Sequence, residues 1–218
     1  MKLIRPLFFI FLFAFTSFTQ ERFVHPVDEA AKDRSFFTFR TKLIAAAERR
    51  DLKYVLGIMD ANITLSFGGH EGVKDFHALW TDKDEFWREF LLVIKNGGAF
   101  EAATESSGRM FIAPYTFSKW PESLDAFEHM VVFGANVNLR SEPSLDAKVL
   151  DRLSYNIVKV AESKKARGKE KEEWYRVESL GGKRGWIKAE YLRSPIDHRA
   201  GFEKKRGGWK MTYFVAGD

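Results

Sequence analysis

The sequence predicts two structural units: an α+β unit of helices plus a small antiparallel sheet, and a small all-β barrel. Apolar residues recur at helical spacing in the first hundred residues, and short strand-like runs follow them. Residues 131–196 consist of short β-rich runs separated by turns about every 8 to 12 positions, which is typical of a barrel. Two more strand-like runs come last. We therefore place the α+β unit at residues 35–130, the barrel at 131–196 and a terminal hairpin at 197–218.

The composition describes an ordinary globular protein and excludes several chemistries. With 218 residues, 45% of them hydrophobic and 30% charged, the chain can form one or two domains with cores. The absence of cysteine excludes thiol catalysis, disulfides, cysteine-ligated metals and a lipoprotein anchor. The net charge of +5 falls to +3 without Lys2 and Arg5, and the basic residues are dispersed. We therefore expect no nucleic-acid partner.

Residues 1–19 have the pattern of a secretory signal peptide. A positively charged start is followed by an apolar run from Leu7 to Phe15, and small residues suit cleavage before Gln20. The apolar run is too short for a membrane-spanning helix, which needs about 20 apolar residues. We expect an exported protein, periplasmic or secreted, without stable membrane insertion after cleavage. The polar residues 20–34 are expected to form a flexible lead-in.

Helices open the α+β unit, and strands follow them. The expected N-caps of three helices are Ser35, Asp51 and Asp84. Strands are expected at residues 62–67, 99–102 and 110–115. Helices that precede a few strands, without regular alternation, indicate an α+β arrangement.

The chain continues past the barrel in a predicted hairpin. The runs Arg199–Lys204 and Gly208–Val215 flank the turn Lys205–Gly208, and apolar and polar residues alternate along the second run. A lone hairpin is unstable in water, so it must pack on another element. We favour a return to the sheet of the α+β unit, with packing on the barrel alone as the competing arrangement.

The motifs of the barrel occur in the order found in one domain family. The opening strand reads Asn138-Leu139-Arg140-Ser141, and later strands carry Trp174 and Gly185-Trp186-Ile187. The usual glycine of one turn is replaced by Tyr155-Asn156, and asparagine tolerates the left-handed backbone of such a turn. From Val137 to Leu192 the sequence resembles a bacterial SH3 (Src-homology 3) domain, and we expect an SH3-like β-barrel.

Nearly all of the chain after residue 20 also resembles a set of exported bacterial proteins of an uncharacterised family. The shared features include Ser66-Phe67-Gly68-Gly69, Trp120-Pro121 and the ending Gly208–Asp218. This wider resemblance brings no activity with it. Its ordered ending supports a hairpin that returns to the first unit.

The SH3 resemblance implies a binding domain, commonly one that recognises peptidoglycan peptides in a groove beside its first loop. Arg140 and Glu142 are the candidates for pairing with carboxylates and amines of the ligand. Arg140 leads because a guanidinium makes two-pronged hydrogen bonds to a carboxylate. The implied aromatic contacts are Trp174, Tyr175 and Tyr191. For each of these aromatic residues, burial in the barrel core is the alternative that the sequence leaves open.

No catalytic motif accompanies these residues. The sequence contains no HExxH, no G-x-S-x-G and no G-x-x-x-x-G-K motif, so we expect no enzyme, no metal and no cofactor. His70 and His77 could hold a metal only on paper. Conceivable paired carboxylates for glycoside chemistry are Glu71, Asp75, Glu101 and Glu105.

Three functional hypotheses follow. The first is an exported, non-catalytic protein of the bacterial cell envelope that binds peptide or peptidoglycan through its SH3-like domain. The second is a protein–protein scaffold, in which the barrel is a structural brace and the partner is an envelope protein. The third is small-molecule binding or weak hydrolysis in a pocket of the α+β unit, which would hold His70 or Glu101.

Overall fold

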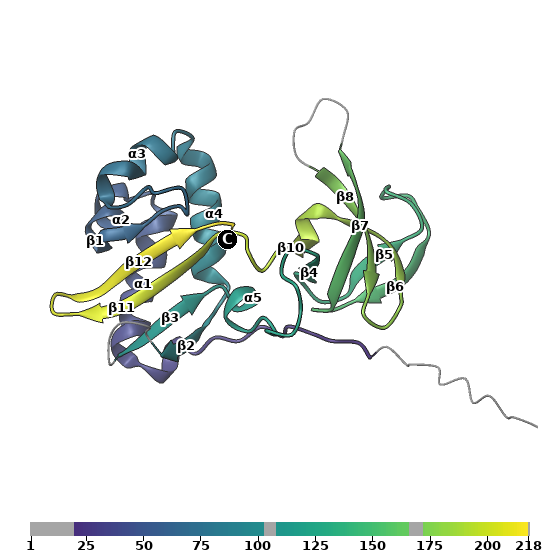
Figure 1. Ribbon diagram of the computed structural model, residues 1–218, viewed down its shortest axis with the longest axis horizontal. Helices are drawn as coiled ribbons and strands as arrows, with labels where there is room; N and C mark the ends of the chain where they lie inside the picture. Colours follow the sequence, from purple (N-terminus) through teal and green to yellow (C-terminus); the bar gives the residue numbers. More distant parts are fainter. Residues whose placement is uncertain (1–19, 103–107, 166–171, 218) are drawn as a thin grey trace, which may run out of the picture.

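The computed structural model describes residues 20–102, 108–165 and 172–217. The expected signal peptide and Glu105 lie outside these residues. Among the described residues, none of the helices has both the length and the apolar character needed to cross a membrane. Figure 1 shows the chain as two units side by side, one of helices and a sheet and one of strands.

The first unit is built from segments at both ends of the described chain. Its helices are η1 (Ala30–Lys32), α1 (Arg34–Glu48), α2 (Leu52–Ile58), η2 (Val73–Asp75), α3 (Phe76–Leu79), α4 (Lys83–Lys95) and α5 (Tyr115–Ser118). Its strands are β1 (Met59–Thr64), β2 (Ala99–Ala102), β3 (Arg109–Ala113), β11 (Arg199–Lys205) and β12 (Gly208–Val215). The five strands form one sheet in the order β1-β12-β11-β3-β2.

Aspartates cap three helices of the first unit, α1, α2 and α4, and two of these caps lie earlier in the sequence than predicted. The side chain of Asp33, not Ser35, accepts hydrogen bonds from the first backbone N–H groups of α1. In the same way Asp82 caps α4 in place of Asp84. Asp51 caps α2 as predicted, because its carboxylate accepts from Tyr54 N. A carboxylate at the N-cap satisfies backbone donors that have no partner within the helix, so the helix begins just after it.

The hairpin β11–β12 occupies the centre of this sheet. β12 runs parallel to β1, with Met211 opposite Met59, and β11 runs antiparallel to β3, with Phe202 opposite Phe111. The sequence left open whether the hairpin packs on the α+β unit or on the barrel. Its strands pair with β1 and β3, which both belong to the first unit. The first unit is therefore discontinuous in the chain, and the second unit is inserted between β3 and β11.

β1 lies earlier in the sequence than the predicted strand. It covers Met59–Thr64 instead of residues 62–67, because Leu65 N donates to His70 O and Gly72 N donates to Ile63 O, which closes a turn. Phe67 lies in this turn with 56% of its surface exposed. The alternation of polar and apolar residues extends into this turn, which is why the sequence predicted a strand as far as residue 67.

Aromatic side chains fill the interior of the first unit between the helices and the sheet. Phe36 of α1 lies with its ring centroid 4.2 Å from that of Phe111 on β3 and 4.8 Å from that of Trp209 on β12. The largest of the fully buried aromatic side chains are Phe36, Phe76, Phe86, Phe90, Phe111, Phe202 and Phe214. Such a close-packed interior supplies most of the stability of the unit.

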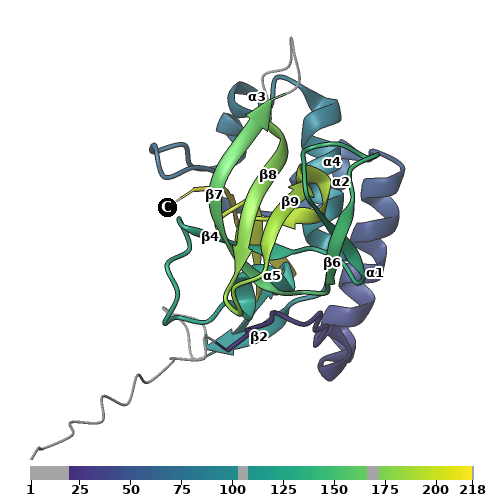
Figure 2. The same ribbon diagram turned by 90° about the vertical axis from the view of Figure 1, so that its right-hand side faces the viewer.

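The second unit is a seven-stranded sheet rather than a closed barrel. Its strands are β4 (His129–Val132), β5 (Val137–Arg140), β6 (Val149–Leu153), β7 (Ile157–Lys165), β8 (Glu172–Ser179), β9 (Arg184–Lys188) and β10 (Leu192–Arg193), with η3 (Ala189–Tyr191) before the last strand. They pair in the order β10-β4-β7-β8-β9-β5-β6, and Figure 2 shows β7, β8 and β9 side by side in this sheet. Among the described residues no pair joins β10 to β6, because the chain leaves β10 after two residues to enter the first unit.

The N-terminal segment 20–34 is a strap between the units and not the flexible lead-in that we expected. Ile157 N donates to Arg22 O and Val24 N donates to Tyr155 O, while Gly98 N of the first unit donates to Val27 O. Val24 is only 2% exposed. The polar composition of the segment concealed these contacts, because their partners lie far away in the sequence; besides the backbone bonds, Glu21 accepts from Ser179 Oγ at 2.7 Å.

Candidate functional site

A groove on the outside of the second unit contains three of the five predicted binding residues. Its volume is about 250 Å³, and it lies between the first residues of β5, the loop after β5, β8, β9 and η3. The lining residues are Ala135, Asn136, Val137, Asn138, Arg140, Leu145, Trp174, Lys188 and Tyr191.

Arg140 is held at the edge of this groove by the loop that follows β5. Its Nη1 donates to Ala147 O at 2.8 Å, so the loop fixes the guanidinium. A guanidinium carries five N–H donors, and the others make no hydrogen bond to a residue that the structure describes. Arg140 is half-buried, and the hydrogen bond to Ala147 O anchors it. The other N–H groups of its guanidinium are available to a ligand.

Trp174 and Tyr191 supply the aromatic surface of the groove. Trp174 is only 6% exposed and lies opposite Lys188 in the β8–β9 ladder. Tyr191, at the end of η3, is 43% exposed. The sequence left ligand contact and burial open for both residues. Trp174 is buried and lines the groove with little exposed surface, whereas the ring of Tyr191 is accessible to a ligand.

Tyr175 and Glu142 do not line the groove. Tyr175 packs against the core of the second unit, together with Val177, because successive residues of a strand point to opposite faces. It borders a different cavity, which also contains Glu190. Glu142 is exposed in the loop after β5. The carboxylate that we expected to pair with ligand amines is therefore absent from the lining of the groove.

The structure adds residues that sequence reasoning missed. Lys188 brings a second cation to the groove, and its Nζ lies 3.1 Å from Glu190 Oε1. The hydrogen bond from Lys188 lowers the pKa of the Glu190 carboxyl. Asn138 shares the outward face of β5 with Arg140, since the buried residues Val137 and Leu139 alternate with them along the strand. That alternation could have identified Asn138, whereas Lys188 depends on the pairing of two strands.

Aromatic side chains fill the interior of the first unit in its described residues, where the third hypothesis would place a pocket. His70 Nδ1 lies 3.1 Å from Ser66 Oγ, and Asp75 accepts from Glu71 N, so these residues order a turn. Glu101 instead borders a hollow of about 500 Å³ on the outer face of the sheet, and burial raises the pKa of its carboxyl. Across the described part of the chain, no three His, Asp or Glu side chains gather in a way that could hold a metal ion.

Comparison with known protein families identifies the domain that contains the groove. Residues 135–193 match the family described as bacterial SH3 domain. This match spans β5 to β10 and includes every residue that lines the groove. No curated protein matches the chain. Residues 135–193, which lie within the insert between β3 and β11, are thus a bacterial SH3 domain.

Proposed function

We propose that this protein is an exported, non-catalytic binding protein of the bacterial cell envelope, and that its SH3 domain binds a carboxylate-bearing peptide of the peptidoglycan type. The observation that carries the proposal is the groove itself. It places Arg140 and Lys188 beside Trp174 and Tyr191, with no carboxylate in its lining. Export is supported by the signal-peptide pattern of residues 1–19.

The chemistry of the groove fits the carboxylate end of a peptide. Charge-assisted hydrogen bonds from a guanidinium to a carboxylate are about twice as strong as neutral ones, and their two-pronged geometry selects a planar group. The exposed ring of Tyr191 and the side chain of Leu145 can cover the apolar part of a short peptide. Peptides of peptidoglycan combine carboxylates with small apolar side chains, which matches this lining.

Co-sedimentation with purified peptidoglycan sacculi tests the proposal. We expect binding at low salt that weakens as salt is added, because exposed charges are screened. Arg140→Ala should weaken binding by about 10- to 100-fold, the equivalent of about 1.5–3 kcal/mol for a hydrogen bond to a charged group. Tyr191→Ala should weaken it less.

Arg184→Ala is the matched control for this experiment. Arg184 is an exposed arginine of the same domain that pairs with Glu178 at 2.8 Å, away from the groove. It should bind as the wild type does. Absence of wild-type binding at low salt, or equal loss in Arg140→Ala and Arg184→Ala, would refute the assignment of the groove.

The scaffold hypothesis keeps one specific observation in its favour. The SH3 domain is inserted in the first unit and tied to it by the strap, through bonds such as Val24 N to Tyr155 O at 2.9 Å. A brace of this kind would hold both units as one surface for an envelope protein. Crosslinking in cells that captures only proteins, together with no binding to sacculi, would favour this alternative.

A further inference from the structure

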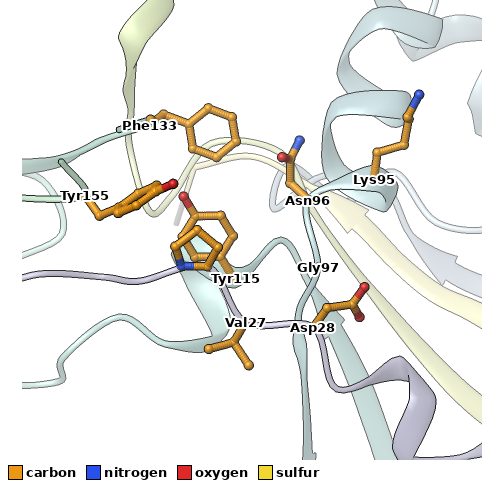
Figure 3. A pocket seen from close by; sticks show the side chains of 10 residues that line it. Val27, Asp28, Lys95, Asn96, Gly97, Tyr115, Phe133 and Tyr155 are labelled. Carbon is orange, nitrogen blue, oxygen red and sulfur yellow. The ribbon is translucent and has the colours of Figure 1, made fainter. Parts of the chain in front are cut away.

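Another cavity lies between the two units and shares no lining residue with the SH3 groove. Its volume is about 380 Å³, and residues of the strap, the end of α4, α5 and the SH3 domain line it (Figure 3). Small-molecule sites often occupy such places, where two units meet, with volumes of about 300–1,000 Å³.

Three aromatic rings form one side of this cavity. Tyr115 comes from the first unit, whereas Phe133 and Tyr155 come from the second. The rings of Tyr115 and Phe133 are stacked, with centroids 5.8 Å apart and planes at 11°. The cavity therefore exists only because the SH3 domain packs on its neighbour.

Tyr155 occupies a backbone position that does not suit its side chain. Its φ is 59°, a left-handed conformation that costs an ordinary residue roughly 1–2 kcal/mol and that glycine or asparagine adopts more readily. Its backbone is fixed by bonds from its N–H to Gly134 O and from Val24 N to its carbonyl. Residues held in such conformations concentrate at binding sites, so the Tyr155 ring at the cavity indicates a role for that ring.

Two tyrosine hydroxyls reach the cavity without a partner. Figure 3 shows the hydroxyls of Tyr115 and Tyr155 directed toward the same space, near Phe133 and Asn96. Neither hydroxyl makes a hydrogen bond to a residue that the structure describes; Tyr115 is buried as a residue, but its oxygen is not among the fully buried polar atoms, so a molecule in the cavity can reach it. Burial raises the pKa of Tyr115 to about 12, so its hydroxyl stays neutral and able to donate. Both hydroxyls are therefore available to a ligand.

The charged residues at the rim are already neutralised. Asp28 receives two hydrogen bonds from the guanidinium of Arg40, at 2.5 and 2.6 Å. Lys95 Nζ lies 2.9 Å from Glu48 Oε1. A charged ligand would thus find no unpaired counter-charge among the described residues that line the cavity. What is left is neutral: two hydroxyls, the Asn96 amide and aromatic surface.

We propose that this cavity binds a neutral saccharide of one or two sugar residues. A sugar ring has one relatively apolar face, which can lie on an aromatic ring, and hydroxyls around its edge that both donate and accept hydrogen bonds. The hydroxyls of Tyr115 and Tyr155 also donate and accept, and the Asn96 side-chain oxygen accepts. The Asn96 amide nitrogen is already used, since it donates to Leu92 O at 2.7 Å.

Calorimetric titration of the purified protein with the disaccharides N,N′-diacetylchitobiose and cellobiose tests this proposal. We expect saturable binding of at least one of them, and the comparison shows whether acetamido groups are recognised. Tetramethylammonium chloride serves as a cation probe, because aromatic rings also bind cations. Failure of both disaccharides to bind, or tighter binding of tetramethylammonium, would overturn the proposal.

Variants locate the binding. Tyr115→Phe and Tyr155→Phe each keep the ring and remove one hydroxyl, so each should weaken saccharide binding by about 3- to 10-fold. Tyr54→Phe is the control, because Tyr54 lines a different hollow on the first unit. Equal affinity of all three variants and the wild type would overturn the site.

Tyr155→Gly separates binding from folding. Glycine adopts the left-handed backbone without strain, so this variant should keep its melting temperature yet lose saccharide binding. Retained binding in Tyr155→Gly would contradict the role of the ring. Binding to sacculi through the SH3 groove should persist in this variant, which distinguishes failure of the cavity from failure of the groove.

Discussion

Replacing Phe214 by alanine should destabilise the first unit, although Phe214 follows the SH3 domain in the chain. Its side chain is fully buried in β12, with its ring centroid 5.4 Å from that of Phe90 and 5.7 Å from that of Trp80. Substitution of a buried phenylalanine by alanine costs about 3–5 kcal/mol. Since rigid aromatic rings surround Phe214 and cannot close the cavity, we expect the upper half of this range, about 4–5 kcal/mol.

Native-state hydrogen exchange, resolved by peptide, is the assay. A loss of about 4 kcal/mol corresponds to roughly 10³-fold faster exchange through global opening, because each 1.4 kcal/mol is tenfold. The acceleration should appear in α1, α4 and β3, which lie far from residue 214 in the sequence. Urea unfolding gives the same free energy independently.

Phe127→Ala is the control, because Phe127 is 70% exposed. It should change the free energy of unfolding by less than about 0.5 kcal/mol. The reasoning fails if Phe214→Ala costs less than about 1 kcal/mol, or if faster exchange is confined to residues 137–192.

Two further predictions concern the backbone and the pH dependence of stability. Gly98→Ala should lower the melting temperature strongly, because the added Cβ would lie 2.1 Å from Ile112 O and the φ of Gly98 is 146°. Gly57→Ala is the control: the added Cβ has open space in α2, so the free energy of unfolding should rise by about 0.5–1 kcal/mol. A smaller change in stability for Gly98→Ala than for Gly57→Ala would contradict this packing. Burial lowers the pKa of His198 below 6.5 despite nearby Glu89, so the unfolded chain takes up the proton first and the free energy of unfolding should fall as the pH drops below 6.5. Urea unfolding at pH 7 and pH 5 measures this fall in the free energy of unfolding, which should be smaller in His198→Gln than in the wild type. An equal fall in both proteins would refute this account.

Local sequence patterns determined most elements of both units. Asp51 before an apolar run predicted the start of α2 correctly, because an N-cap acts within one helical turn. The order of motifs from Asn138 to Trp186 predicted the bacterial SH3 domain that the family match shows. The alternation in the two runs after Leu192 and the glycine-containing turn between them predicted a hairpin at the residues where β11 and β12 occur.

Only the tertiary structure decided what these elements face. Alternation separates Trp174 from Tyr175 but does not say which face of β8 meets the core, so the sequence placed both in one groove and the fold separates them. The strap was hidden because its backbone and side-chain hydrogen bonds, such as Ile157 N to Arg22 O and Ser179 Oγ to Glu21 Oε1, join residues that lie far apart in the sequence. The same holds for Lys188 beside Trp174 and for Tyr115 beside Phe133: each pair comes from segments that meet only after strands and units have packed.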